Sequence, residues 1–117
     1  MSQVQIKAIL NDSTIGIQRN ETDTITTAGD AIDYRVLGIG TSEEEITLST
    51  EIGNAGYFFV RNMDDENFVD LGFATTVYPI RLLAGHFALI PLTPATASVF
   101  AKADTAECSV EFYFHEA

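Results

Sequence analysis

The sequence predicts an all-β fold, a single-domain antiparallel β-sandwich of jelly-roll-like type over residues 1–117. Apolar and polar side chains alternate along most of the chain, which places every second side chain on the same face of a strand. Turn-forming residues (Gly, Pro, Asn and Asp) interrupt the alternation about every 8–12 residues, a spacing typical of sandwiches. No stretch has the apolar spacing of a long helix. We therefore expect about nine to eleven short strands.

The strand pattern is clear near the start of the chain. Apolar residues from Val4 to Leu10 fall on one strand face, and the polar residues between them fall on the other. Residues 11–13 form a turn, because Asn and Asp tolerate left-handed backbone. Ile15 and Ile17 start a second short strand. Residues 22–27 are rich in Thr, which favours an extended, solvent-facing strand.

The middle of the first half contains one ambiguous segment. Residues 32–36 alternate again, and the glycines at 38 and 40 mark a bend. Residues 42–45 (Ser-Glu-Glu-Glu) resemble the capping box of a helix. Residues 46–50 alternate between apolar and polar, however, so we predict a strand there and keep one helical turn as the alternative.

The second half is more aromatic and more sharply divided by turns. Residues 57–60 form a continuous apolar run, residues 63–67 form an acidic turn, and residues 68–72 return, so we predict a hairpin over 57–72. Pro79 cannot donate a ladder hydrogen bond and indicates a strand end or a sheet edge. Gly85 supplies a tight turn. The remaining strands are expected around residues 80–82, 87–92, 99–103 and 108–115.

Charge and composition exclude several classes of partner. Six Lys and Arg residues against seventeen Asp and Glu residues give a formal net charge of −11. Nucleic-acid binders need a cationic surface, and anionic membranes attract basic segments, so we expect neither partner. The first residues lack the features of a signal peptide, and no run is long enough for a transmembrane helix. Cys108 is the single cysteine, so no internal disulfide forms, and we expect it to be a buried core residue.

No motif of enzyme chemistry or metal binding stands out. His86 and His115 are isolated from each other, and neither belongs to a spacing that binds zinc. A nucleophile elbow is absent, and Gly38-Ile39-Gly40-Thr41 lacks the third glycine and the lysine of a phosphate loop. A Ser-His-Asp triad converges only in space, so sequence alone leaves it open. We predict no catalytic, cofactor-binding or metal-binding residue.

The acidic segment between Asp64 and Asp70 has two interpretations. Calcium binds six to eight oxygen ligands, and loops of β-sandwiches often supply several carboxylates. The residues Asp64, Asp65, Glu66 and Asp70 do not follow the spacing of a calcium-binding EF-hand loop, however. A solvated turn is the simpler interpretation, and it also applies to residues 43–45.

The aromatic residues of the second half suggest assembly. Aromatic side chains in short strands belong more often to a core or a subunit interface than to a ligand groove. With eight Phe residues and a net charge of −11, an obligate assembly would cover whatever surface of this kind the single chain leaves exposed. We expect the second half to form the inner sheets. The first strand or the Thr-rich segment would then supply the edges between subunits.

About half of the chain, residues 56–114, carries a recognisable pattern. It comprises Gly-Tyr-Phe-Phe-Val-Arg-Asn-Met-Asp from residue 56, Phe-Val-Asp-Leu-Gly from residue 68, Arg-Leu-Leu-Ala-Gly-His-Phe-Ala-Leu-Ile-Pro-Leu from residue 81, and Ala-Lys-Ala-Asp-Thr-Ala from residue 101. The pattern resembles a group of small virion structural proteins of tailed bacteriophages. That resemblance implies a jelly-roll-like β-sandwich without catalytic residues.

The resemblance also implies a function and partners. We expect a non-enzymatic capsid decoration or cement protein that bridges capsomers on the outer surface of the virion and is made in the host cytoplasm. Its partners would be the major capsid protein and further copies of itself, as in trimers at local threefold axes. The acidic charge agrees with an outer position, because a protein that lined the genome chamber would repel packaged DNA.

Three alternatives remain open. One is a head–tail or tail-associated structural protein, which would be present in far fewer copies. Another is a carbohydrate-binding β-sandwich, although sugar platforms favour Trp and this chain has none. The third is a small cupin-type enzyme, for which two isolated histidines are too few.

Overall fold

In the computed structural model, which describes all of residues 1–117, the chain forms ten strands and no helix. This confirms the predicted all-β class. The strands are β1 (Ser2–Asp12), β2 (Ile17–Thr27), β3 (Ile32–Ile39), β4 (Glu44–Thr47), β5 (Ala55–Asn62), β6 (Val69–Gly72), β7 (Ile80–Leu82), β8 (Phe87–Pro91), β9 (Ser98–Ala103) and β10 (Cys108–Glu116).

The last eight strands form a sandwich of two four-stranded antiparallel sheets. One sheet has the order β3-β10-β5-β8 and the other has the order β4-β9-β6-β7. If these eight strands are lettered B to I along the chain, the orders read B-I-D-G and C-H-E-F, which is the connectivity of a jelly roll. The predicted jelly-roll-like sandwich is therefore confirmed.

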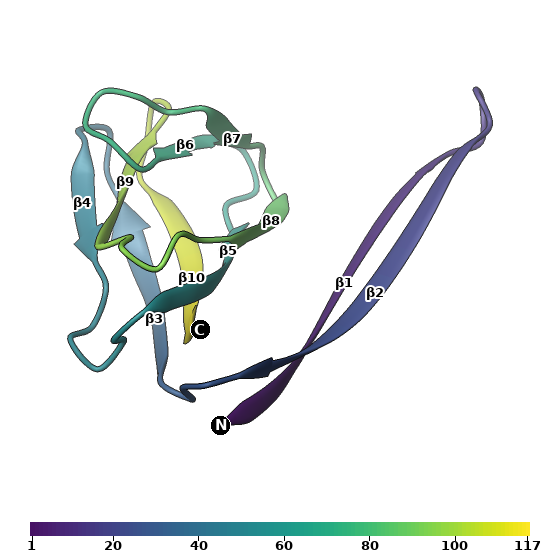
Figure 1. The fold of residues 1–117 in the computed structure, drawn as a ribbon. Helices are drawn as coiled ribbons and strands as arrows, with labels where there is room; N and C mark the ends of the chain where they lie inside the picture. Colours follow the sequence, from purple (N-terminus) through teal and green to yellow (C-terminus); the bar gives the residue numbers. More distant parts are fainter.

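The first two strands form a separate hairpin that the sandwich does not include. β1 and β2 pair only with each other, from Ser2 opposite Thr27 to Asp12 opposite Ile17. Figure 1 shows this hairpin leaving the sandwich at its lower edge and projecting away from it. We call residues 2–27 the arm and residues 28–117 the body. Ile17 to Thr27 form one continuous strand rather than the two expected segments, and Ile15 lies in the turn.

The predicted hairpin over residues 57–72 is wrong. β5 pairs with β10 and β8 in one sheet, whereas β6 pairs with β7 and β9 in the other. The acidic turn therefore carries the chain from one layer of the sandwich to the other. Both segments are apolar and largely buried, so local pattern identified each strand correctly but could not identify its partner.

The core lies between the two sheets and is built mainly from the second half of the chain. Stacked Phe rings form its centre, with centroids of Phe58 and Phe114 4.7 Å apart and those of Phe58 and Phe112 6.0 Å apart. Cys108 is fully buried and free, as predicted. Its burial raises the pKa of the thiol, which keeps the sulfur protonated and unreactive.

A buried asparagine fixes the end of β5. The side-chain amide of Asn62 donates to the carbonyls of Asn67 (2.8 Å) and Leu82 (3.1 Å), and its oxygen accepts from the Asp64 amide (3.0 Å). The Gly85 amide donates to the Asn62 carbonyl, with Gly85 at a φ of 77° that favours glycine. Asn62 thus joins the β5–β6 and β7–β8 connections at one point, and the turn expected at Gly85 is confirmed.

Candidate interaction site

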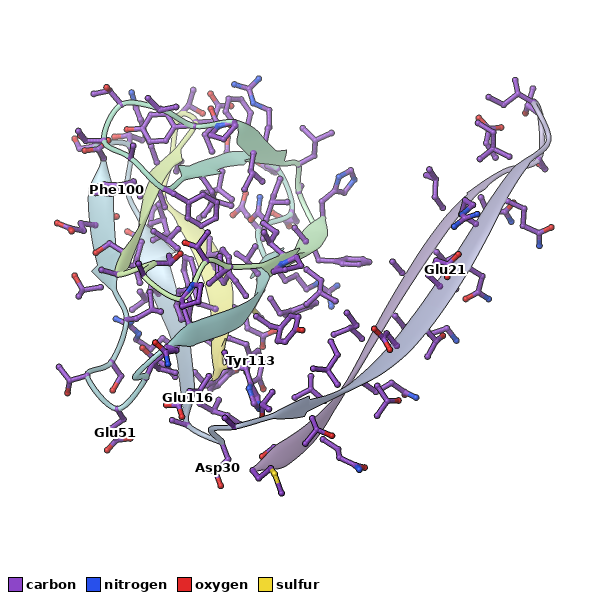
Figure 2. All side chains as sticks on the ribbon, in the orientation of Figure 1. Glu21, Asp30, Glu51, Phe100, Tyr113 and Glu116 are labelled. Atoms are coloured by element: carbon purple, nitrogen blue, oxygen red, sulfur yellow. The ribbon has the colours of Figure 1, made fainter.

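A row of aromatic rings crosses the outer face of the β3-β10-β5-β8 sheet. The centroid of Tyr113 lies 4.3 Å from that of Tyr34 and 6.3 Å from that of Phe59, and the Phe59 ring lies 6.2 Å from that of Phe87. Each ring comes from a different strand, so the row spans all four. We call Tyr34, Tyr113, Phe59 and Phe87 the aromatic row. In Figure 2, Tyr113 lies on the side of the body that faces the arm.

Much of this outer face is exposed although it is apolar. Phe87 is 67% exposed, and Tyr34 and Tyr113 are also exposed, as are their neighbours Ile32 and Val36. In a sandwich sheet, the side chains that point to the outer face are normally polar. A face of this composition on a protein surface is typical of a contact site.

The base of the arm lies over one part of the outer face. Val4, Ile6 and Ile25 project from the same side of the arm and are half-buried, whereas the polar residues on the other side are exposed. Between arm and sheet lie two open grooves of about 430 and 360 Å³. Tyr57 and Leu89 line both of them from the body, and Ile6 lines both from the arm. The arm therefore rests on the sheet loosely and forms no ladder hydrogen bonds with it.

The apolar side of the arm continues past the edge of the body. Leu10 and Ile17 lie on the same side as Val4 and Ile6, and both are exposed, Leu10 at 66%. Three charged residues, Asp12, Arg19 and Glu21, lie on this side as well. Ile9, on the opposite side, is exposed as well. A two-stranded hairpin in water is marginally stable on its own. The outer half of the arm therefore presents apolar surface without the packing that would normally stabilise a strand pair.

Hydrogen bonds at the elbow between arm and body set the direction in which the arm leaves. The Gly29 amide donates to the Ala117 carbonyl, and the Glu116 amide donates to the Ala31 carbonyl, both at 2.9 Å. The buried Thr27 hydroxyl donates to the carbonyl of Gly29. The elbow is thus fixed to the end of β10, and the arm beyond it is held mainly by its own ladder.

Charge is distributed unevenly between arm and body. The arm carries two basic and three acidic side chains, a net charge of −1, so the body carries the remaining −10 of the formal −11. The outer face itself is nearly neutral: Arg61 and Glu111 are its charged side chains. Glu111 accepts a hydrogen bond from the Tyr34 hydroxyl (3.0 Å), which raises the pKa of that tyrosine. The acidic charge of the molecule therefore lies mostly away from the outer face and the arm.

The histidines and the cysteine considered from sequence do not come together. His86 lies in the turn before β8, His115 faces outward on β10, and Cys108 lies in the core. No group of three or more His, Cys, Asp or Glu side chains has the geometry of a metal site. No helix in the structure is long and apolar enough to cross a membrane.

The acidic segment from Asp64 to Asp70 is engaged in local hydrogen bonds. The Asp64 carboxylate accepts from the amides of Asn67 (2.6 Å) and Glu66 (3.1 Å), and these bonds lower its pKa. Asp70 forms a two-point ion pair with Arg81, at 2.8 and 3.0 Å. Arg81 in turn lies 3.8 Å above the centre of the Phe68 ring. These carboxylates close a turn and join β6 to β7 rather than converging on one point.

A second carboxylate has a comparable structural role just before β4, in the same sheet as β6 and β7. Glu43 accepts from the Thr75 hydroxyl and the Thr76 amide, both at 2.6 Å, and from the Tyr78 hydroxyl. These bonds lower the pKa of Glu43 and raise that of Tyr78. Thr76 has a φ of 60°, which is strained for a residue with a side chain. Glu43 thus holds the loop between β6 and β7 in a conformation that the loop would not favour alone.

The exposed aromatic row and the uncovered side of the arm are features of a surface that contacts another molecule. No family model, curated protein or solved structure matches the chain. The interpretation of the site consequently depends on its own geometry.

Sequence reasoning identified some members of the site and missed others. Phe59 and Phe87 belong to the aromatic set for which a core or an interface was expected, and they lie on the outer face. Tyr34 and Tyr113 were not singled out. Both fall on the side of their strands opposite the core residues, so their position in the alternation was the available signal.

Proposed function

We propose that this chain is a non-enzymatic virion structural protein, a capsid decoration or cement protein that bridges neighbouring capsomers from the outer surface. The observation that carries the proposal is the arm, a projecting hairpin whose apolar side continues uncovered beyond the body. A projecting strand pair of this kind can contact a neighbouring molecule that the body itself does not touch. A protein that bridges the subunits of a shell needs contacts with more than one of them.

Fold and charge support the same proposal. The jelly roll occurs in viral capsid proteins, although it also occurs in lectins and cupins, so this support is analogy at the level of fold. A body with a net charge of −10 avoids repulsion by packaged DNA only on the outside of a shell. A protein that binds the assembled shell, and not its free subunits, stabilises the shell by its binding free energy.

Copy number in purified virions tests the proposal. Quantitative mass spectrometry of particles from a host that expresses the chain should find hundreds of copies per particle. A number near six or twelve would favour the alternative, a head–tail or tail-associated structural protein. Absence from the particles would overturn both. Added back to particles that lack it, the protein should also raise the temperature at which they release DNA.

The aromatic row favours one second candidate function, carbohydrate binding. Exposed rings aligned on a flat sheet offer a surface on which sugar rings can stack, and the row contains two Tyr residues. Sugar recognition also needs several polar groups around the rings. The row has Arg61 and Glu111 beside it, and its other neighbours include the apolar Ile32, Val36 and Leu89. A glycan array should distinguish the two functions, since a capsid-binding protein gives no sugar-specific signal and a lectin gives a defined set.

A further inference from the structure

We infer that the outer half of the arm docks on the exposed aromatic row of a second copy of this chain. The inference rests on the proposed role in assembly and deepens it, because it names the two surfaces through which neighbouring copies join. Neither surface is satisfied within one chain. Leu10 and Ile17 extend past the body. Tyr34 and Phe87, at the two ends of the aromatic row, lie outside the area that the arm covers, whereas Phe59 and Tyr113 between them line the groove beneath the arm.

The first argument for a second copy is continuity with a contact that already exists. Within one chain, Val4 and Ile6 of the arm face Tyr57 and Leu89 of the outer face. The same side of the arm then continues to Leu10 and Ile17, and the same sheet face continues across the aromatic row. The chain therefore presents two exposed surfaces whose inner parts already face each other across two grooves. A second copy supplies each surface with the partner that its own chain cannot reach.

The second argument is charge. Two bodies with a net charge of −10 repel each other, so copies of this chain associate best through surfaces that carry little of that charge. The arm, at −1, and the outer face, with Arg61 and Glu111, are such surfaces. Arg61 forms no ion pair within its own chain, and neither does Asp12, which lies on the same side of the outer half of the arm as Leu10 and Ile17. A neighbouring arm brings a carboxylate of this kind to a face with a free guanidinium.

The contact joins a projecting element of one copy to a flat face of the next. Such a heterologous contact closes into a ring when the rotation between copies allows it and otherwise gives an open chain. A pair that exchanges arms reciprocally is the smallest closed form. The mass of the assembly gives the number of copies directly.

Sedimentation velocity of the purified full-length chain tests the inference without any capsid. The wild-type chain should self-associate reversibly in the micromolar range. Leu10→Asp should weaken the association by about 10- to 100-fold, as expected when a buried apolar side chain is lost. The matched control is Ile9→Asp, because Ile9 is 62% exposed on the opposite side of the same strand. This control should leave the association within about twofold of the wild type, since surface changes outside a contact have small effects.

A substitution on the body tests the other half of the contact. Phe87→Asp should weaken association as Leu10→Asp does, whereas Phe73→Asp, on an exposed loop of the other sheet, should not. The two damaging variants should complement each other. When they are mixed, the intact arm of the Phe87→Asp chain can bind the intact face of the Leu10→Asp chain, so a mixed dimer should appear although each variant alone is monomeric. Circular dichroism of each variant checks that the fold is retained.

Three results would overturn the inference. The wild-type chain could remain monomeric at high micromolar concentration. Ile9→Asp could weaken association as much as Leu10→Asp, or the mixed variants could fail to associate. Failure here is separable from failure of the proposed function. A monomeric chain found in hundreds of copies per virion would refute the arm contact alone. A self-associating chain absent from virions would refute the capsid role alone.

Discussion

In the body, each strand is hydrogen-bonded within a four-stranded sheet whose inner face packs on a second sheet, whereas β1 and β2 pair only with each other. Both regions show the same alternation of apolar and polar residues. In the body the apolar side is buried to 0–4% at positions such as Phe58, Leu71 and Leu82, while at the outer end of the arm Leu10 remains 66% exposed. The comparison teaches that alternation specifies which side of a strand needs a partner, and that the partner can belong to another molecule.

The largest expected effect is the loss of a core ring in the body. Phe58→Ala should lower the free energy of unfolding by about 3–5 kcal/mol, because Phe58 is fully buried and stacks on Phe112 and Phe114. Leu10→Ala in the arm should change it by less than about 0.5 kcal/mol. Urea denaturation, at a protein concentration where the chain is monomeric, measures the change in the free energy of unfolding for both variants. Equal losses in the two variants would show that the arm is part of the cooperative core.

The next effect concerns the polar centre of the body. Asn62→Ala should cost about 2 kcal/mol, because the carbonyls of Asn67 and Leu82 and the amide of Asp64 lose their partner. Asn20→Ala in the arm is the matched control, since Asn20 is exposed and its side chain forms no hydrogen bond within the protein. The same denaturation measurement applies. An unchanged midpoint for Asn62→Ala would mean that water replaces the lost amide.

Removal of the whole arm should affect the stability of the body less than either core substitution. A chain that begins at Ala28 loses the half-buried contacts of Val4, Ile6 and Ile25 and the hydrogen bond of the buried Thr27 to Gly29, for which we expect about 1.5 kcal/mol in all. Calorimetry of the shortened chain should still show one cooperative transition. If the shortened chain failed to fold, the body would depend on the arm for its stability, and the two would not be separate units.

The smallest effect is a pH dependence that arises in the body. The folded pKa values of Asp64 and Glu43 lie below their ordinary values of 3.8 and 4.5. Their hydrogen bonds therefore add stability above those ordinary values, and this contribution is lost as the pH falls through the lower, folded pKa. Asp64→Asn and Glu43→Gln should melt earlier than wild type at neutral pH, and the difference should narrow below about pH 4.

A control in the arm separates this local effect from the general effect of charge. Asp23→Asn also removes one negative charge, but the Asp23 side chain accepts no hydrogen bond within the protein. Its melting temperature should follow that of the wild type at every pH. A parallel shift in all three variants would mean that net charge, and not the two hydrogen-bonded turns, governs the acid response.

The sequence predicted the elements of the fold better than their partners. Alternation located the strands and their buried faces, and the chemistry of Gly85, Asn62 and Cys108 agreed with their positions. Pairing depends on residues far apart in the chain, so the expected hairpin over 57–72 was wrong and the separation of the arm was not foreseen. The aromatic row depends on the order β3-β10-β5-β8, which no local pattern contains.

The elbow has a consequence for the order of events during synthesis. β1 and β2 are made before the strands of the body and can pair locally within microseconds. The amide of Gly29 and the carbonyl of Ala31, however, meet their partners only at residues 116 and 117, at and just after the end of β10. The arm is thus paired early, but the bonds that orient it form only after β10 has been made.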